Sequence, residues 1–184
     1  MSDYPKTITL SRSSGQEEVF LIRRCTEADL FDIMELQYRI KENPPDPGLY
    51  AVLEEEGVHE SLCEDYCFGA YCRGRLAGFT VMVANRISPR NYGAYIGYPE
   101  ERQRQCVTME LSIVDDEFRG YGLQKVFVSL REAEARSAGA TEALVSIAPD
   151  NKYSLDNIIS SGYEIVDTRP LHEGAVRHIL SKKL

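Results

Sequence analysis

The sequence predicts a single-domain α/β protein: one observation indicates the α/β class, and two indicate the single domain. Segments that alternate between apolar and polar residues, as strands do, stand between segments with the period of an amphipathic helix. Hydrophobic residues make up 43% of the 184 residues, so the chain can bury one sizeable core. It has no internal repeats and no low-complexity stretch. We therefore expect a single domain that covers residues 1–184.

Eight segments have the composition or the alternation of β-strands. In chain order they are Thr7–Leu10, Val19–Ile22, Tyr66–Cys72, Leu76–Ala84, Thr108–Val114, Leu144–Ile147, and two more near Glu164–Asp167 and Val176–Leu180. The third and fourth strands are expected to form a hairpin across Arg73-Gly74-Arg75. A long connection, residues 85–105, precedes the fifth strand.

Helices are expected between these strands. Thr26 and Asp29 are spaced as in a capping box, and the apolar residues after them predict a helix from about Glu27 to Lys41. Prolines at positions 44, 45 and 47 should end it, and a shorter helix should run from Leu49 to about Glu60. A third helix should follow the fifth strand, and a short fourth helix should begin at Ser154.

A glycine-bearing turn joins the fifth strand to the helix after it. The turn reads Arg119-Gly120-Tyr121-Gly122-Leu123-Gln124. A helix N-terminus has unpaired backbone N–H groups and a partial positive charge, which together attract phosphate. The glycines remove Cβ atoms that would keep a pyrophosphate away from the backbone, and Arg119 adds a planar cation. The turn therefore predicts a phosphate-bearing ligand.

Two other phosphate-binding turns do not fit this segment. A dinucleotide-binding fingerprint needs a third glycine where this chain has Lys125, and a continuously apolar strand before it. The strand here alternates, with Thr108, Glu110 and Ser112 on its polar face. A P-loop needs Gly-Lys-Ser/Thr, which does not follow. Taken alone, the segment could also be an ordinary glycine-rich turn.

The turn and the alternating strand before it together resemble the acyl-CoA-binding turn of the GNAT superfamily of N-acetyltransferases. A second match lies downstream, where Asn151, Ser154 and Gly162-Tyr163 have the spacing usual in that family. The order of the expected elements also fits, so the resemblance covers the chain from about Val19 to Leu184.

The resemblance implies the GNAT fold, a mixed and mostly antiparallel sheet with helices on both faces, splayed at the fifth strand. It also implies acetyl-CoA as cosubstrate. The residues expected to bind it are Ile113 and Val114 through their backbone amides, then Arg119, Gly120, Tyr121, Gly122, Leu123 and Gln124 of the turn, and finally Asn151 and Ser154. Asn151 could equally be only a helix N-cap.

Two residues depart from the family pattern. Gln124 replaces the usual small residue at the end of the turn, which should still leave the first backbone amides of the helix free. Ile158 occupies the position where many members carry a catalytic tyrosine, so the usual general acid is missing. A thiol with a pKa of about 8.5 is a fair leaving group, and water could protonate the departing sulfur.

Acetyl transfer to an amine also needs a group that removes a proton. An alkylammonium has a pKa of about 10.4, so few molecules are free nucleophiles near neutral pH. Glu110 lies on the polar face of the strand that leads into the turn, where a carboxylate can take the proton directly or through water. Glu110 is therefore the candidate base, and the alternative is a solvent-facing strand residue.

The predicted function is transfer of an acetyl group from acetyl-CoA to a primary amine, by direct attack in a ternary complex. Direct transfer follows the family, and no Cys-His or Ser-His spacing in the chain suggests a covalent nucleophile. The alternative is a catalytically weak acyl-CoA-binding protein that senses or regulates. Ile158 favours that alternative slightly.

Charge and composition limit the partners. A net charge of −8 argues against nucleic acid or an anionic membrane and favours a cationic acceptor, either a small-molecule or a peptide amine. We expect no secretory signal and no membrane span, and the five cysteines suit a reducing cytoplasm. Tyr92, Tyr95 and Tyr98 in the long connection suggest a substrate-binding wall or a homodimer contact, unless they are chance loop composition.

A metal site is the remaining candidate. His59, Cys63, Cys67 and Cys72 lie close together in the sequence. However, Cys67 and Cys72 are five residues apart on an expected strand and should point to opposite faces. The spacing also differs from that of paired zinc-binding cysteines. We therefore expect no metal, and cysteines that are buried and inert.

Overall fold

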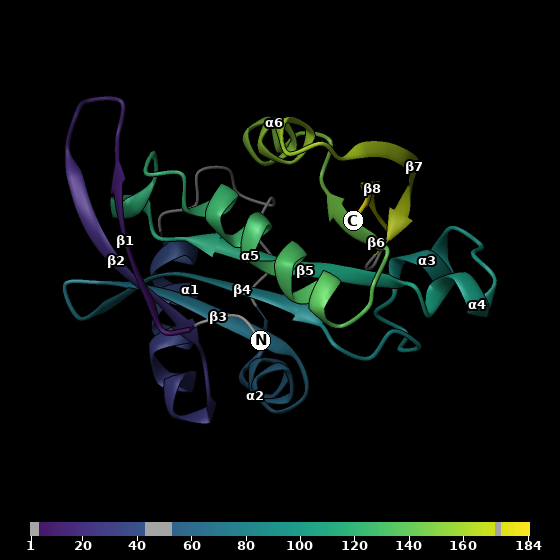
Figure 1. Ribbon diagram of the computed structural model, residues 1–184, viewed down its shortest axis with the longest axis horizontal. Helices are drawn as coiled ribbons and strands as arrows, with labels where there is room; N and C mark the ends of the chain where they lie inside the picture. The colour runs from purple at the N-terminus through teal and green to yellow at the C-terminus, as the bar shows by residue number, and fades with distance from the viewer. Residues whose placement is uncertain (1–3, 43–52, 172–173) are drawn as a thin grey trace. The chain divides into compact units, whose positions relative to one another are not determined.

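The computed structural model describes residues 4–42, 53–171 and 174–184 (Figure 1). The strands in this part of the chain are β1 (Lys6–Ser11), β2 (Glu17–Arg24), β3 (Tyr66–Cys72), β4 (Arg75–Val83), β5 (Cys106–Val114), β6 (Glu142–Ile147), β7 (Glu164–Leu171) and β8 (Ala175–Lys183). They follow the hydrogen-bonded order β1-β2-β3-β4-β5-β6-β8-β7. β5 and β6 are parallel, whereas β1-β2, β2-β3, β6-β8 and β7-β8 are antiparallel. The predicted mixed, mostly antiparallel sheet is confirmed.

The helices complete the α/β fold. They are η1 (Glu27–Asp29), α1 (Leu30–Glu42), α2 (Glu55–Glu64), α3 (Tyr92–Tyr95), α4 (Glu100–Gln103), η2 (Asp116–Phe118), α5 (Leu123–Ser137) and α6 (Lys152–Ser160), where η marks a single 3₁₀ turn. The predicted capping box is confirmed, because the backbone N–H of Thr26 donates to Asp29 at 2.8 Å. No helix in the described residues is long and apolar enough to cross a membrane.

Two segments differ from the sequence prediction. α2 begins at Glu55, later than predicted, because Leu53 exchanges backbone hydrogen bonds of 2.9 and 3.2 Å with the Gln37 side chain and is held out of the helix. The remaining predicted start of this helix, and the three prolines, lie outside the described residues. The long connection before β5 is also not without structure, since it contains α3 and α4.

The chain forms two compact units. The N-terminal unit comprises Ser2–Val81 and Leu111–Phe127, and the C-terminal unit comprises Met82–Glu110 and Val128–Leu184. β5 contributes to both, because its residues up to Glu110 belong to one unit and those after it to the other.

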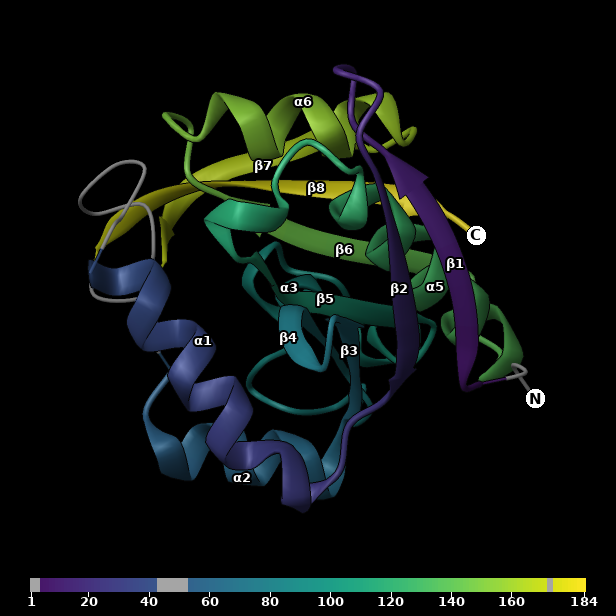
Figure 2. The ribbon, with the colours of Figure 1, turned by 90° about the vertical axis from the view of Figure 1, so that its left-hand side faces the viewer.

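In the N-terminal unit, α1 and α2 pack against one face of β3 and β4 (Figure 2). Ile33 of α1, Val58 of α2 and Phe79 of β4 are completely buried in this core. The start of α5 covers the other face of β4. Gly78 makes room for it, since a Cβ there would lie 3.0 Å from the ring of Phe127.

The C-terminal unit also has helices on both faces of its strands. Tyr92 of α3 and Ile179 of β8 belong to one buried hydrophobic cluster on one face. Lys182 is three residues further along β8, so its side chain points to the opposite face. There it donates to Glu132 of α5 at 2.8 Å and to the carbonyl of Ser161, just after α6, at 2.8 Å. The predicted arrangement of helices therefore holds within each unit.

A buried carboxylate joins several elements of the C-terminal unit. Glu142, at the start of β6, is 1% exposed and accepts hydrogen bonds from Ser181 at 2.6 Å, Lys183 at 2.6 Å and Arg102 at 3.1 Å. Burial alone would raise its pKa. The three donors more than offset that effect and lower the pKa of Glu142 to about 2.

Replacing Glu142 with glutamine is expected to lower the free energy of unfolding by about 3 kcal/mol near neutral pH. The folded pKa lies below the unfolded one, so the carboxylate stabilises the protein above about pH 4.5 and less as the pH falls toward about 2. Denaturant titrations from about pH 7 to about pH 3 should show the two proteins converging. Glu100→Gln, which removes an exposed pair with Arg104, should change little at any pH.

Candidate functional site

The polar face of β5 is held by the connection that follows β4, within the C-terminal unit. Thr108 accepts the backbone N–H of Tyr92 at 3.2 Å. Glu110, two residues further on the same face, is held by Arg90. The loop that carries Arg90 and Tyr92 is in turn fixed by Asn91, whose amide donates to the carbonyls of Arg86 and Gln103.

Glu110 and Arg90 form a two-pronged ion pair. Arg90 Nε donates to Oε1 of Glu110 at 2.7 Å, and a second guanidinium N–H donates to Oε2. The side chains of Glu110 and Arg90 are 22% and 29% exposed, so both are partly buried, and the base role of Glu110 stays a prediction. Each carboxylate oxygen has two lone pairs, so Glu110 can still accept a hydrogen bond from a cationic amine while it is paired with Arg90.

Tyr92 lies beside this ion pair. Burial raises its pKa to about 12, a hydrogen bond to Ser146 lowers it, and the nearby charge of Glu110 raises it. The phenol therefore stays protonated at neutral pH and does not act as a base. Of the other two tyrosines in this connection, Tyr98 lies under the guanidinium of Arg102, and Tyr95 is 39% exposed.

The glycine turn belongs to the N-terminal unit. Gly120 and Gly122 have φ values of +84° and +80°, a conformation that side chains with a Cβ rarely adopt. Space around Gly122 is open, because a Cβ at this residue would have no heavy atom within 4 Å. The first backbone hydrogen bonds of α5 are donated by the N–H groups of Lys125 and Val126 to the carbonyl of Gly122, at 3.0 and 3.2 Å. The turn thus has the backbone geometry of an anion seat at a helix N-terminus.

The side chain of Arg12, in the tight turn between β1 and β2, forms hydrogen bonds to the backbone of the glycine turn. Its Nε donates to the carbonyl of Arg119 at 2.8 Å, and its terminal N–H donates to the carbonyl of Glu117. The guanidinium lies over the ring of Tyr121, 4.5 Å from its centre. Among the described residues no carboxylate forms an ion pair with Arg12. Its positive charge therefore remains available beside Gly120.

The buried carboxylate of Asp115 holds the start of the glycine turn in place. It is 6% exposed, its carboxylate accepts the N–H of Glu117 at 3.0 Å, and Arg39 of α1 donates to it at 2.9 Å. Its own N–H donates to the carbonyl of Ala77 in β4 at 2.9 Å. Glu117 is held from outside by Arg75 at 2.5 Å. The turn is thus preorganised by side chains from α1 and β4.

The side chains of the turn residues differ in exposure to solvent. Arg119 pairs with Asp116 at 2.6 Å and is 37% exposed, so its guanidinium lies at the surface of the turn. Tyr121 is 4% exposed and packs edge-on against Phe20, and Leu123 is also buried. A ligand would meet Tyr121 and Leu123 through their backbone atoms. Gln124, in the first turn of α5, is partly exposed.

The end of β5 contains the residues expected to donate backbone amides. The pairing of β5 with β6 runs from Cys106 to Met109, although β5 continues to Val114. Ile113 and Val114 are buried, and Ile113 belongs to the core beneath α1 and α2. The hydroxyl of Ser112, one residue earlier, is buried without a hydrogen-bond partner among the described residues. The oxyanion role of the two amides stays a prediction.

The second predicted segment opens α6 in the C-terminal unit. Asn151 is the N-cap of this helix, because its side chain accepts the N–H of Ser154 at 3.1 Å. That is the simpler of the two roles that the sequence left open, and contact with a cofactor stays a prediction for both residues. Ile158, for which the sequence resemblance expects a tyrosine, is 7% exposed and packs in the core.

The fold is that of acetyltransferases of the GNAT family. The GNAT domain of S. lividans PAT superposes with a TM-score of 0.70 and 17% identity, covering 99% of this chain and 100% of that one. A ribosomal-protein-alanine N-acetyltransferase from Brucella melitensis has a TM-score of 0.68 and 20% identity, with coverage of 89% and 99%. PaiA N-acetyltransferase from Thermoplasma acidophilum, solved with coenzyme A, has a TM-score of 0.67 and 14% identity, with coverage of 90% and 99%. No family model and no curated protein sequence matches the chain.

Proposed function

We propose that the protein transfers an acetyl group from acetyl-CoA to a primary amine, and that residues 1–184 act as one acetyltransferase domain. The single observation that carries this proposal is the glycine turn, where two positive-φ glycines open α5 beside an arginine that has no carboxylate partner among the described residues. The neighbours of the same fold are acetyltransferases, and one of them holds coenzyme A.

In this proposal the turn binds the pyrophosphate of acetyl-CoA through the first backbone N–H groups of α5 and the cations of Arg12 and Arg119. Glu110 takes a proton from the acceptor ammonium, directly or through water, with a carboxylate lone pair that Arg90 does not use. The free amine attacks the thioester carbonyl, and the backbone amides of Ile113 and Val114 stabilise the oxyanion. Collapse of this intermediate breaks the C–S bond, the nitrogen releases its extra proton to the solvent to give the neutral amide, and the CoA thiolate takes a proton from water.

The acceptor is expected to be a primary amine of a small molecule or of a peptide. The net charge of −8 favours a cationic acceptor. A neighbour that is named for acetylating a ribosomal protein makes peptide N-termini a reasonable first set of acceptors to screen.

Thermal unfolding with acetyl-CoA, followed by an assay of CoA release with a panel of amines, tests the proposal. Ligand at a hundred times its Kd should raise the melting temperature by about 5–10 °C. Gly122→Ala should lose most of this shift because the backbone of the turn is displaced. Gly139→Ala is the matched control: it follows α5, has a φ of +75° and equally open surroundings, and should be destabilised similarly but keep the shift. No shift in the wild type at millimolar ligand would refute the proposal.

A catalytically weak acyl-CoA-binding protein is the second candidate. Two observations favour it: Ile158 is buried at the tyrosine position, and Arg90 engages both oxygens of Glu110. The same assay separates the two functions. Both predict the thermal shift, but only the enzyme releases CoA faster when an amine is present.

A further inference from the structure

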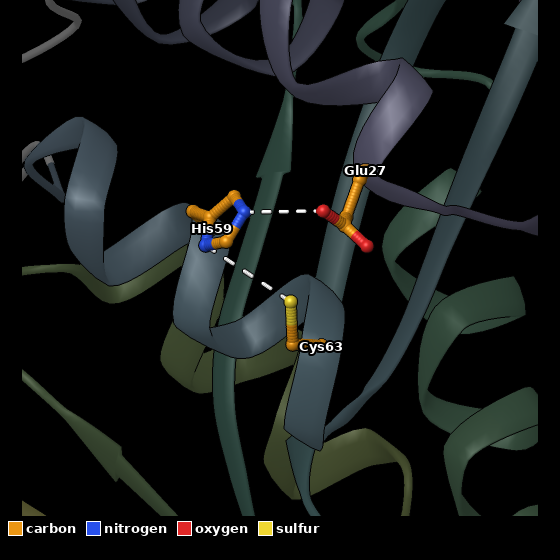
Figure 3. Close-up of side chains that lie close together, drawn as sticks. All are labelled: Glu27, His59 and Cys63. Carbon is orange, nitrogen blue, oxygen red and sulfur yellow. Dashed lines mark hydrogen bonds and ion pairs between the residues drawn. The ribbon is translucent and has the colours of Figure 1, made fainter.

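Three side chains with metal-ligating atoms meet at the surface of the N-terminal unit (Figure 3). His59 and Cys63 are four residues apart on α2, so they share one face of the helix. Glu27 reaches them from η1. The Nε2 atom of His59 lies 3.2 Å from Oε2 of Glu27, and its Nδ1 atom lies 4.0 Å from the sulfur of Cys63.

One ion can bind only one ring nitrogen of His59, whereas the two distances above involve opposite nitrogens. One donor atom from each residue can be chosen so that all three lie within 4.8 Å of one another. Two nitrogen, oxygen or sulfur ligands of a tetrahedral zinc are about 3.3–3.7 Å apart, given bonds of about 2.0–2.3 Å. The side chains of His59 and Glu27 are 50% and 67% exposed, so small rotations can bring the three donors inward.

The order Cys63–His59–Glu27 also resembles the nucleophile, base and orienting acid of a cysteine hydrolase. The charges oppose that reading. α2 contains four glutamates and no lysine or arginine. This negative surface stabilises a divalent cation, which can take the place of the thiol proton.

We propose that Glu27, His59 and Cys63 form a binding site for a transition-metal ion, with Zn²⁺ as the best fit and water as the fourth ligand. Imidazole and thiolate select zinc over magnesium or calcium, which prefer oxygen ligands. Binding forms a metal–sulfur bond and releases the Cys63 proton to solvent. The ion would connect η1, which contains Glu27, to α2, which contains His59 and Cys63.

This site differs from the cluster that the sequence suggested. Cys67 and Cys72 are buried, as expected, with Cys67 donating to the carbonyl of Ser61 at 3.2 Å. Cys63 is exposed, so the expectation of buried cysteines is wrong for it. The ligand that completes the set, Glu27, lies 32 residues before His59 in the sequence. The proposal is independent of acetyl transfer.

Titration of the reduced, metal-free protein with Co²⁺ tests the site, because a cobalt–thiolate bond gives a characteristic near-ultraviolet absorption. The expected result is saturation at one equivalent, loss of the band when Zn²⁺ is added, and a higher melting temperature with Zn²⁺. Cys63→Ser should abolish the band. His59→Ala and Glu27→Gln should weaken cobalt binding, whereas Glu60→Gln, which removes a neighbouring charge on α2 but no ligand, should leave the stoichiometry unchanged.

Two outcomes would overturn the proposal. One is the absence of a cobalt–thiolate band in the wild type. The other is a band that needs Cys63 but is unchanged in both His59→Ala and Glu27→Gln, which would show a lone surface thiol and no assembled site. All the residues changed are exposed or at the helix surface, so the variants should fold, and unaltered melting temperatures without metal would establish that they do.

Discussion

Glu110→Gln is expected to lower turnover with saturating acetyl-CoA and amine by about 10²–10⁴-fold, the contribution typical of a general base. Glutamine keeps the size of the side chain but cannot accept the proton from the ammonium group. The acetyl-CoA-induced thermal shift should stay intact, because the glycine turn is untouched. The activity of the variant should recover as the pH approaches the pKa of the acceptor, since the solvent then supplies free amine.

Arg90→Ala is the control for this prediction. If Glu110 only anchors the loop through Arg90, removing either partner breaks the same ion pair, and both variants should lose turnover equally. If Glu110 is the base, Arg90→Ala leaves the carboxylate in place, and its loss of turnover should be far smaller than that of Glu110→Gln. Near-normal turnover of Glu110→Gln over a wide pH range would exclude the base role.

The sequence predicts best what is encoded locally. The turn from Arg119 to Gln124 could be recognised because glycines with positive φ and the start of an amphipathic helix are properties of neighbouring residues. The capping box of Thr26 and Asp29 was found for the same reason. The polar face of β5 followed from alternation, so Glu110 was placed correctly on the face that also holds Thr108.

Partners that are distant in the sequence could not be predicted in this way. Arg12 meets the carbonyl of Arg119 across 107 positions, and nothing in the short Ser11–Gln16 turn indicates an anion site. Arg90 lies in a connection without periodicity, so no pattern links it to Glu110. The late start of α2 depends on the side chain of Gln37, which belongs to another helix. In each case a tertiary contact, and no local preference, determines the structure.

Arg12→Ala is expected to weaken acetyl-CoA binding by about 10–100-fold, the loss for one charge-assisted hydrogen bond to an anion. The reason is twofold: Arg12 supplies a positive charge that no described carboxylate compensates, and it holds the carbonyls of Glu117 and Arg119 away from the anion. Calorimetric titration with acetyl-CoA at low and high salt measures the effect. The wild-type affinity should fall more steeply with salt than that of the variant.

The matched control is Arg24→Ala. Arg24 also stacks on a tyrosine, 4.8 Å from the ring centre of Tyr66, and also donates to a carbonyl, that of Asp65 at 3.3 Å, but it lies outside the turn. It should therefore change neither the affinity nor its salt dependence. Arg12→Lys separates charge from bracing, because lysine keeps the charge but cannot bond both carbonyls in one plane. If Arg12→Ala and Arg24→Ala bind acetyl-CoA equally well, the charge of Arg12 does not face the ligand, and the turn would have to bind phosphate through its backbone amides and Arg119 alone.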